Sequence, residues 1–485
     1  MTRPATDRAL HEWIGLIAGP VLAGLILWLF EPAGLSVAGR MTAAVAVLMA
    51  VWWATEAIPV AATAFLPIVL FPVLGILPMA QTAPNYANPT IYLFLGGFVM
   101  ALVIERSGLH RRVALLVFNL VGVNGSSLVG GFMLAAALLS MWISNTSTAL
   151  MLLPIVMSII VVVRETMPDL DNKAQQDFGT AMLLGLAYGA TLGGMTTLVG
   201  TPPNAFMVGF MQSNYDVEID FARWMMVGVP LAVIMLPICW IMLTRVLFKV
   251  GFKSSAAARR HIIGVNEDLG RLTTAEWRAG LLFVFLVAGW LLRKPLAELT
   301  GMVDLTDAGV AMTAAVLAFI IPSGSRSGAL MTWEETQRLP WGVLILFGGG
   351  LALAAGMSSS GLTLWIGQQL APLGTVHIIL LIVAATALVI FLTELTSNLA
   401  TTATFLPVMA ALAVETGNDP LLFVIPITLA ASCAFMLPVA TPPNAVVFSS
   451  GLLSIPRMIR AGFALNIIGV AVLSVIAVFL APQIF

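Results

Sequence analysis

Long apolar runs separated by short polar or Pro/Gly breaks repeat along the chain from Ile14 to the C-terminus. Each run approaches or exceeds the roughly 18 residues that a helix needs to cross the hydrocarbon core of a bilayer. We therefore expect an all-α polytopic membrane protein that follows a short polar tail at residues 1–13. The predicted crossings, eleven in all, are 14–30, 41–56, 60–78, 90–104, 178–213, 224–247, 275–292, 308–322, 341–357, 420–450 and 462–483.

Two further apolar stretches, 127–163 and 376–414, are each interrupted midway by a polar Ser-Asn cluster. If such a stretch simply spanned the membrane, the interruption would leave backbone groups without hydrogen-bond partners in lipid. Both stretches are therefore predicted to be re-entrant hairpins, which enter the membrane and leave it on the same side.

The composition agrees with this pattern and excludes several function classes. The chain is 60% hydrophobic and 9% charged, against about 25% charged residues in an ordinary soluble domain. Its net charge of −1 offers no attraction for nucleic acid. Cys239 and Cys433 lie apart in apolar segments and form no metal-ligand grouping with histidine. The sequence contains no protease, hydrolase or nucleotide-binding motif, so neither an enzyme nor a nucleotide-driven pump is expected.

Basic residues are distributed unequally between the two predicted sides of the membrane. If the N-terminus is cytoplasmic, the opposite side holds only four of the 22 Lys and Arg residues, namely Arg40, Arg223, Arg293 and Lys294. Positive residues concentrate in the cytoplasmic loops of membrane proteins. We therefore expect a cell-membrane protein with a cytoplasmic N-terminus, a cytoplasmic linker at 248–274 and its C-terminus on the other side.

The chain also contains an internal repeat. A shift of 253 residues places Ser144-Asn145 on Ser397-Asn398. The string TPPNA follows each pair, at 201–205 and at 441–445. Landmarks matched in the same order indicate that the two halves of the chain share one architecture.

The orientation of the two halves follows from the number of crossings between them. Five predicted crossings separate the two hairpins, and because this number is odd, the hairpins enter the membrane from opposite sides. Residues 14–247 and 275–485 are therefore predicted to be inverted repeats. Inverted repeats with interrupted helices in corresponding positions are typical of alternating-access transporters whose binding site lies near the midplane of the membrane.

The Ser-Asn clusters concentrate neutral oxygen atoms at the breaks of the hairpins. Hydroxyl and amide oxygens, with freed backbone carbonyls, suit a partly desolvated Na⁺, whereas a carboxylate-rich cage would suit Ca²⁺ or Mg²⁺. The helix that begins after each cluster would also present free N–H groups to an anion. Ser and Thr often do no more than join membrane helices, but two clusters matched under the repeat favour a binding site.

The two TPPN segments are expected to interrupt their helices, because consecutive prolines remove N–H donors and disfavour helical geometry before them. The carbonyl groups of Gly200 and Ala440 are thereby freed to coordinate a cation. A proline kink that only shapes the helix is the alternative, and the presence of two matched copies favours function. Neither motif contains Lys or Arg, so a bound dianion would need co-bound cations as its countercharge.

Glu56 and Glu394 are two acidic residues inside the predicted membrane segments. A carboxylate at that depth fits two roles. It binds a proton or a cation, or it anchors the scaffold or the hairpin. The sequence leaves both roles open.

The segments WWATEAIPVAATAFLP (52–67) and ASCAFMLPVATPPNAVV (431–447), together with both Ser-Asn motifs, resemble the divalent anion/sodium symporter family of dicarboxylate, citrate and sulfate carriers. The resemblance covers almost the full chain. It implies a homodimer in the lipid bilayer, with a scaffold domain and a transport domain that moves as an elevator. It also implies sodium-coupled symport of C4 dicarboxylates such as succinate, malate and fumarate. Sulfate symport, sodium-independent dicarboxylate exchange and a channel are the alternatives.

The same resemblance assigns ligands by motif, with Na⁺ as coupling ion and no other cofactor. One Na⁺ site would use Ser140, Ser144, Asn145 and the Gly200 carbonyl, and the other would use Thr393, Thr396, Asn398 and the Ala440 carbonyl. The substrate carboxylates would contact Ser144, Asn145, Thr146, Thr201, Ser397, Asn398 and Thr441. Leu399 departs from the family pattern, because a hydroxyl often stands after the second Ser-Asn pair. The missing hydrogen bond would be worth about 1 kcal/mol.

Overall fold

The computed structural model describes residues 8–120, 122, 124–167, 170–252, 270–301, 304–324 and 328–485. Within these ranges the regular elements are helices, and the β structure is one isolated bridge between Pro322 and Ala329. The prediction of an all-α protein is thereby confirmed. The first seven residues of the predicted tail, and residues 253–269 of the predicted linker, lie outside the described residues.

The first half of the chain begins with helices that precede the first hairpin and continues with the hairpin and a broken helix. The helices are α1 (Leu10–Leu29), α2 (Val37–Thr55), α3 (Val60–Thr63), α4 (Leu66–Val73), α5 (Met79–Thr82), α6 (Pro89–Ser107), α7 (Leu109–Leu120), α8 (Gly125–Ser140), α9 (Asn145–Thr166), α10 (Asn172–Gly194), α11 (Pro202–Tyr215) and α12 (Phe221–Ile241). A short 3₁₀ helix, Ala83–Ala87, joins α5 to α6, and a π-helical turn, Met242–Leu247, extends α12.

The second half repeats this order from α17 onward. Its helices are α14 (Thr274–Leu291), α15 (Arg293–Thr300), α16 (Asp307–Ile320), the 3₁₀ helix η3 (Glu334–Arg338), α17 (Trp341–Ser359), α18 (Leu362–Leu370), the 3₁₀ helix η4 (Ala371–Thr375), α19 (Ile378–Thr393), α20 (Asn398–Glu415), α21 (Leu421–Ser432), α22 (Pro442–Phe448), α23 (Ile455–Val475), the π-helical η5 (Ile476–Leu480) and α24 (Ala481–Ile484). Helices α6 to α12 thus find their counterparts in α17 to α23.

The described residues contain nine helices that are long and apolar enough to cross a membrane. Most of them coincide with predicted crossings, but α9 and α20 are second arms of the two hairpins. The predicted crossings at 60–78 and 308–322 are shorter apolar helices, because each is interrupted or ended by a turn. The predicted crossings at 178–213 and 420–450 are each broken into two helices, as the prolines of TPPN require.

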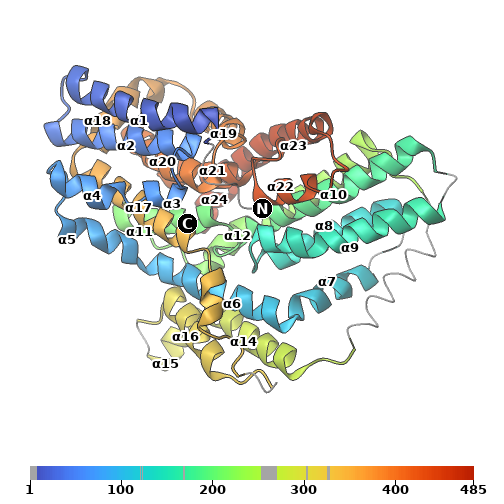
Figure 1. Ribbon diagram of the computed structural model, residues 1–485. Coiled ribbons are helices and arrows are strands. Elements are labelled where there is room, and N and C mark those ends of the chain that lie inside the picture. Colours follow the sequence, from blue (N-terminus) through green and yellow to red (C-terminus); the bar gives the residue numbers. More distant parts are fainter. Residues whose placement is uncertain are drawn as a thin grey trace.

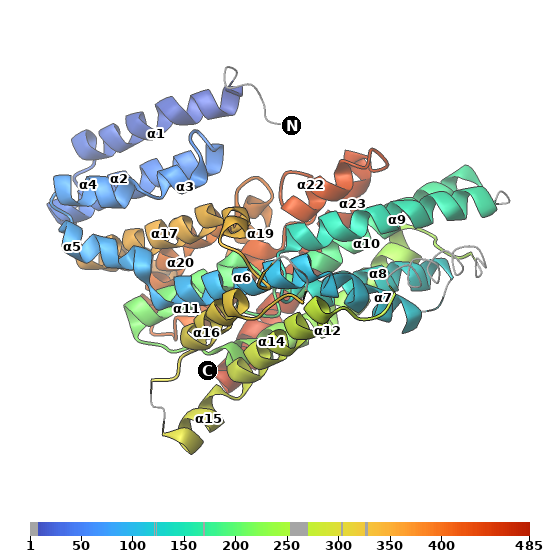
Figure 2. The same cartoon turned by 60° about the horizontal axis from the view of Figure 1, so that its bottom comes forward.

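Helix α10 forms the centre of the molecule. Every residue from Asp177 to Gly194 is buried, and α8, α9, α12 and α22 pack around the helix. In both ribbon views α8, α9 and α10 extend to one end of the molecule, while α1, α2, α4 and α5 lie at the other (Figures 1 and 2). Trp224, Trp290 and Tyr188 are among the largest fully buried side chains.

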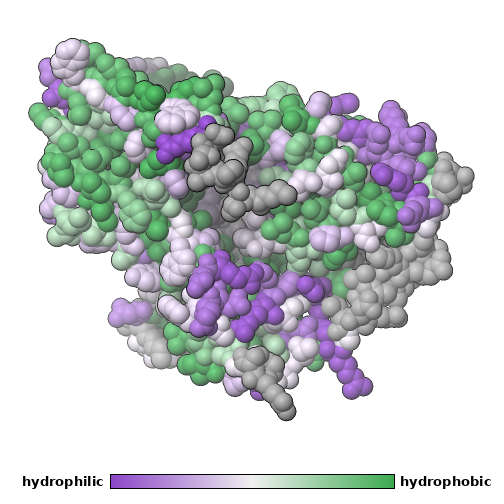
Figure 3. Space-filling model, viewed as in Figure 1, coloured by the Kyte–Doolittle hydropathy of each residue, from purple (hydrophilic) through white to green (hydrophobic). Residues whose placement is uncertain are grey.

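The outer helices present apolar side chains to the surroundings. Only 17% of the apolar stretch of α1 is buried inside the structure. Ile17 and Trp28 of this helix are 63% and 79% exposed. Figure 3 shows the apolar cover over the end formed by α1 and α2, with hydrophilic residues gathered elsewhere on the same face. A surface of this kind suits contact with lipid rather than with water.

Candidate functional site

The first hairpin turns at the Ser-Asn cluster. Helix α8 ends at Ser140, and α9 begins at Asn145 with Ser144 as its N-cap residue. The Ser144 hydroxyl accepts from the Ser147 backbone N–H at 3.1 Å, which stabilises the new helix end. The Ser140 hydroxyl donates to the Asn145 side-chain oxygen at 2.5 Å. The break predicted from the sequence is thus a tight turn whose amide oxygen is oriented by a buried hydroxyl.

The second hairpin repeats the turn with other side chains. Helix α19 ends at Thr393 and α20 begins at Asn398. The Thr393 hydroxyl lies within hydrogen-bond distance of the Asn398 side-chain oxygen, at 3.0 Å, and of the Ala431 carbonyl, at 2.8 Å. The Thr396 hydroxyl contacts the Thr401 hydroxyl at 2.6 Å. Thr393 therefore occupies the place that Ser140 occupies in the first hairpin.

Each hairpin turn faces a broken helix. Residues 195–201 separate α10 from α11, and residues 433–441 separate α21 from α22. The asparagine of each TPPN motif braces the segment before it, because the Asn204 side-chain amide donates to the Thr197 carbonyl at 2.8 Å and the Asn444 amide donates to the Leu437 carbonyl at 3.0 Å. The spacing is seven residues in both halves.

The bracing asparagines were not predicted as functional, although the repeated TPPN string carried them. Their amide nitrogens are used within the break, yet Asn204 Oδ1 and Asn444 Oδ1 are buried and have no hydrogen-bond partner among the described residues. A buried oxygen without a donor is unfavourable unless another group satisfies it. A bound cation is one such group.

Close packing fixes the first turn against the first break. A Cβ atom added to Gly194 would lie 2.3 Å from the Asn145 side-chain oxygen, so the amide rests directly on this glycine. A Cβ atom added to Gly200 would lie 2.3 Å from the Gly194 carbonyl oxygen. A side chain at Gly194 would displace the Asn145 amide, and a side chain at Gly200 would clash with the backbone of Gly194.

The two turns and the two breaks meet at one cavity of about 730 Å³. All residues predicted to contact substrate line it, namely Ser144, Asn145, Thr146, Thr201, Ser397, Asn398 and Thr441. Gly200 and Ala440, the predicted carbonyl ligands, line it as well. Ser140, Thr393 and Thr396 do not line this cavity, and the first two contact it through the asparagines that they hydrogen-bond. The structure therefore brings together residues that are up to about 300 positions apart in the sequence.

Further residues line the cavity from helices outside the motifs. Leu399 lies in its wall, as expected for a residue beside the second Ser-Asn pair. Glu56, whose backbone adopts a left-handed conformation at the end of α2, and Glu105 at the end of α6 also line it. Arg338 from η3 completes the set of charged lining residues. Glu105 and Arg338 were not predicted as site residues, because neither belongs to a Ser-Asn or a TPPN motif.

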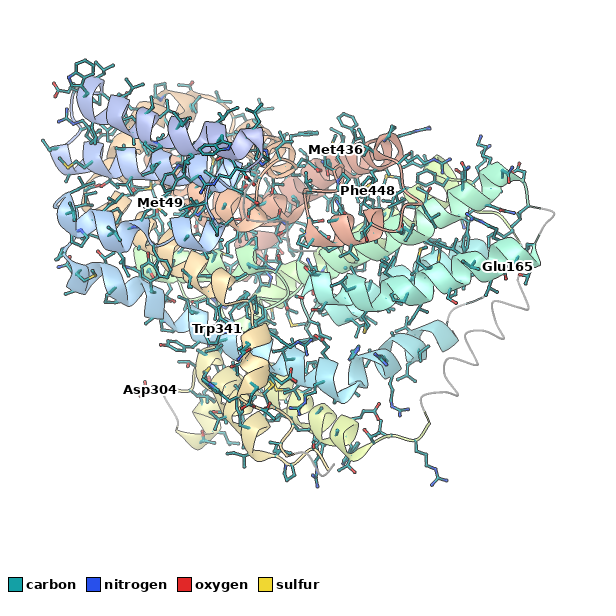
Figure 4. The ribbon with its side chains drawn as sticks, viewed as in Figure 1. Met49, Glu165, Asp304, Trp341, Met436 and Phe448 are labelled. Atoms are coloured by element: carbon teal, nitrogen blue, oxygen red, sulfur yellow. The ribbon has the colours of Figure 1, made fainter. Side chains whose placement is uncertain are left out.

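Glu394 is an anchor of the second break. Its buried carboxylate accepts from the backbone N–H groups of Phe435, Met436 and Leu437 at 2.8–3.1 Å. It also accepts from the side-chain amide of Asn466 on α23 at 2.8 Å. The sequence left open a role in binding a proton or cation and a role in anchoring the hairpin. The contacts of Glu394 correspond to the anchoring role. Figure 4 labels Met436 in the segment that Glu394 holds, and Trp341 at the start of α17.

A second cavity of about 860 Å³ adjoins the first. It lies between the end of α6, α7 and α9, and it shares Leu102, Glu105, Ile143, Ser147 and Arg338 with the cavity at the motifs. An ion pair joins Arg338 to Glu105 at this junction, and Arg338 also pairs with Glu335 at 3.2 Å. The hydrogen bond that the Arg338 guanidinium donates to the Glu105 carboxylate raises the pKa of Arg338 above its ordinary value, so the guanidinium stays charged.

Comparison with known proteins places this architecture in a family. The chain matches the model of the sodium:sulfate symporter transmembrane region over residues 10–483. It is 41% identical to a sodium-dependent dicarboxylate transporter, SdcS, of Staphylococcus saprophyticus, and the match covers 98% of this chain and 92% of that protein. It is also 41% identical to SdcS of Staphylococcus aureus strain USA300, over 97% of this chain and 91% of that protein.

A solved structure shares the fold. The crystal structure of the YdaH transporter of Alcanivorax borkumensis superposes with a TM-score of 0.54 at 16% identity, covering 82% of this chain and 87% of that chain. At this identity the likeness concerns the fold alone. The family model and the staphylococcal relatives each span nearly the whole chain and agree with the resemblance found in its motifs. The chain belongs to the sodium:sulfate symporter family, which is the divalent anion/sodium symporter family expected from its motifs.

Proposed function

We propose that this chain is a membrane symporter that couples the entry of Na⁺ to the uptake of small divalent anions, with C4 dicarboxylates such as succinate as its substrates. The observation that carries the proposal is the 730 Å³ cavity at which both Ser-Asn turns and both TPPN breaks converge. Similarity to proteins named sodium-dependent dicarboxylate transporters supports the choice of ion and substrate.

The lining of the cavity suits a dianion that binds together with cations. The motif residues offer hydroxyl groups, amide groups and the N-terminal ends of α9 and α20, and such helix ends favour negative charge. None of the motif residues is basic, and moving an unaccompanied charge through a bilayer costs at least about 2.5–3.5 kcal/mol for a single charge. Co-bound Na⁺ ions would remove much of this cost.

We assign the two Na⁺ sites to the two halves of the repeat. The first site would use Ser140, Ser144, Asn145 and the Gly200 carbonyl, and the second would use Thr393, Thr396, Asn398 and the Ala440 carbonyl. In each half a hydroxyl orients the asparagine oxygen, which leaves that oxygen free to accept a second partner on its other lone pair. The ions would therefore lie beside the substrate, where they offset its charge.

Transport would occur by movement of a transport domain relative to a scaffold domain within each protomer. We assign α8–α12 and α19–α23 to a transport domain and the remaining long helices to a scaffold, within repeats 14–247 and 275–485. The protein would be a homodimer in the cell membrane, with a cytoplasmic N-terminus and a C-terminus on the opposite side. The exposed apolar side chains of α1 support contact with lipid.

The direct test is uptake of labelled succinate into proteoliposomes with and without an inward sodium gradient. The proposal predicts accumulation above the external concentration only when the sodium gradient is present. Excess unlabelled malate or fumarate should compete, and sulfate is tested in the same assay because the family description names it. Uptake that is insensitive to sodium would contradict the proposal and would support exchange instead.

A further inference from the structure

Two cavities of the structure meet at a charged junction. The 730 Å³ cavity at the motifs and the neighbouring 860 Å³ cavity share Glu105 and Arg338 among their lining residues. We call the larger one the vestibule. A ligand that moves between the two cavities therefore passes the guanidinium of Arg338.

Arg338 is the single basic residue among the described residues that line the binding cavity. Its side chain is half exposed, so its charge is open to a ligand in solution. Its position is fixed, because η3 leads through Leu339 and Pro340 into α17 and because the Trp341 indole N–H donates to the Thr336 carbonyl at 2.9 Å. The charge therefore remains at the junction.

The vestibule carries more positive than negative side chains. Arg106, Arg111 and Arg338 line it, together with Glu105 and His110. Arg106 and Arg111 are exposed, and among the described residues neither forms an ion pair with a carboxylate. Burial lowers the pKa of His110, so this residue adds no charge near neutral pH. The excess of arginine distinguishes the vestibule from the binding cavity, where the motif residues are neutral.

We propose that the vestibule is a second dianion-binding site, in which a substrate carboxylate displaces Glu105 from Arg338 before or after the substrate occupies the sodium-dependent site. The proposal rests on the function proposed above for the neighbouring cavity. The vestibule site differs from the sodium-dependent site in the source of its positive charge. Because arginine replaces Na⁺ as the countercharge, this site binds dicarboxylates without sodium.

The displacement of Glu105 by a substrate carboxylate leaves the number of carboxylates bound to Arg338 unchanged. Glu105 and the incoming carboxylate are both acceptors for the same guanidinium, so one charge-assisted hydrogen bond replaces another. The Glu105 side chain is 32% exposed and can be hydrated after it is displaced. Glu335 keeps its own contact with the other terminal nitrogen of Arg338. The site is therefore weak, which suits a position that a substrate occupies only in transit.

The test uses protection of a cysteine placed in the vestibule. Leu150 on α9 lines the vestibule and is 56% exposed, whereas the native Cys239 and Cys433 are buried. The L150C protein in detergent is treated with a neutral thiol reagent in sodium-free choline buffer, with and without millimolar succinate. We expect succinate to slow the modification by roughly twofold, the scale of a solvent-exposed ion pair. Raising the ionic strength should weaken the protection, because salt screens exposed charges.

Further variants in the L150C background identify the group responsible. R338Q should abolish the protection and R338K should retain part of it. E105Q should strengthen the protection, because the competing carboxylate is gone, and this opposite effect cannot arise from misfolding. E335Q is the matched control, since Glu335 contacts Arg338 but lines neither cavity, and it should leave the protection in place.

The outcomes separate this inference from the proposed function. Protection that requires sodium, or that persists in R338Q, would overturn the vestibule site. Sodium-driven succinate uptake by proteoliposomes without any sodium-free protection would overturn the vestibule site alone. Sodium-free protection in a protein that shows no sodium-driven uptake would overturn the proposed function while the succinate contact with Arg338 stands.

Discussion

The two halves of the molecule build the same site by different means. In both, a hydroxyl contacts the asparagine oxygen of the hairpin turn, and the TPPN asparagine braces the broken helix at a spacing of seven residues. The first half secures its break through neutral contacts, since the Thr197 hydroxyl donates to the Met141 carbonyl at 2.6 Å. The second half uses the carboxylate of Glu394 at the position that the repeat assigns to Met141.

The difference extends to the packing. Gly194 and Gly200 of the first break correspond under the TPPN repeat to Ala434 and Ala440 of the second. In the first half a Cβ atom added to Gly194 or to Gly200 would lie 2.3 Å from a neighbouring oxygen, and in the second half the hydrogen bonds of Glu394 hold the break. Both halves share the Ser-Asn pairs and the TPPN strings at the cavity, and they differ in the contacts that hold the two breaks in place.

The largest effect should follow from removing the shared asparagines. N145A and N398A each delete an oxygen assigned to both ion and substrate. Hydrogen bonds to charged groups are worth about 1.5–3 kcal/mol, so transport should fall roughly 10- to 100-fold or more in either variant. Thermal unfolding in detergent serves as the control for folding. Wild-type uptake by either well-folded variant would remove that asparagine from the site.

The second prediction concerns the charged anchor of the second half. E394Q should lower the free energy of unfolding by about 2–3 kcal/mol or more, because one of the two carboxylate oxygens that accept from buried N–H groups is replaced by an NH2 group, which can only donate. M141L, the matched change in the first half, should cost less than about 1.5 kcal/mol, because the contact with Thr197 is made by the Met141 backbone carbonyl, which the substitution retains. Thermal unfolding of both purified variants measures the difference. Equal destabilisation would show that the two halves are supported alike.

The third prediction concerns Gly200 and Ala440, whose carbonyl groups are freed at the two breaks. G200A should destabilise the protein by about 1–3 kcal/mol, because the added Cβ would lie 2.3 Å from the Gly194 carbonyl oxygen. A440G, which reverses the change in the second half, creates no clash and should cost less than about 1 kcal/mol. Unfolding in detergent again gives the measurement. A tolerated G200A would contradict the close packing of the first break.

The smallest effect should come from the position directly after each Ser-Asn pair, where the two motifs differ. Leu399 lines the cavity where the first half has Thr146. L399T adds a hydroxyl beside the proposed substrate, and one hydrogen bond is worth about 1 kcal/mol, or roughly a fivefold change in affinity. Competition of succinate uptake by malate, fumarate and sulfate should therefore change. Identical competition profiles would show that residue 399 does not contact the ligand.

Much of the fold was predictable because hydrophobic length and proline chemistry act locally. The Ser-Asn turns and the TPPN breaks lie where the sequence places them, and the hairpins at 125–166 and 378–415 differ from the predicted bounds by a few residues only. The Ser-Asn and TPPN residues that the repeat relates to one another also line one cavity. These features depend on short-range patterns that the sequence displays directly.

Other parts of the site depend on contacts between distant segments. Arg338 reaches the cavity from a 3₁₀ helix between α16 and α17, and Glu105 meets it from the end of α6. Nothing in the local sequence around either residue indicates this pairing. The role of Glu394 likewise depends on the course of residues 435–437, which periodicity does not reveal.

The central claim, that Na⁺ supplies the countercharge of a dianion, is tested most directly by sodium-driven succinate uptake at a clamped membrane potential. Proteoliposomes with valinomycin and defined potassium gradients set the potential, and one elementary charge moved through 100 mV is worth about 2.3 kcal/mol. Na⁺ ions at the two assigned sites balance one dianion, so such a cycle moves no net charge, whereas a third Na⁺ would carry one net positive charge inward. Because the family resemblance favours electrogenic symport, the account predicts that uptake requires sodium and that an inside-negative potential stimulates it. Uptake that requires sodium but ignores the potential would rule out an ion beyond the two assigned sites, and uptake that ignores sodium would contradict the claim itself.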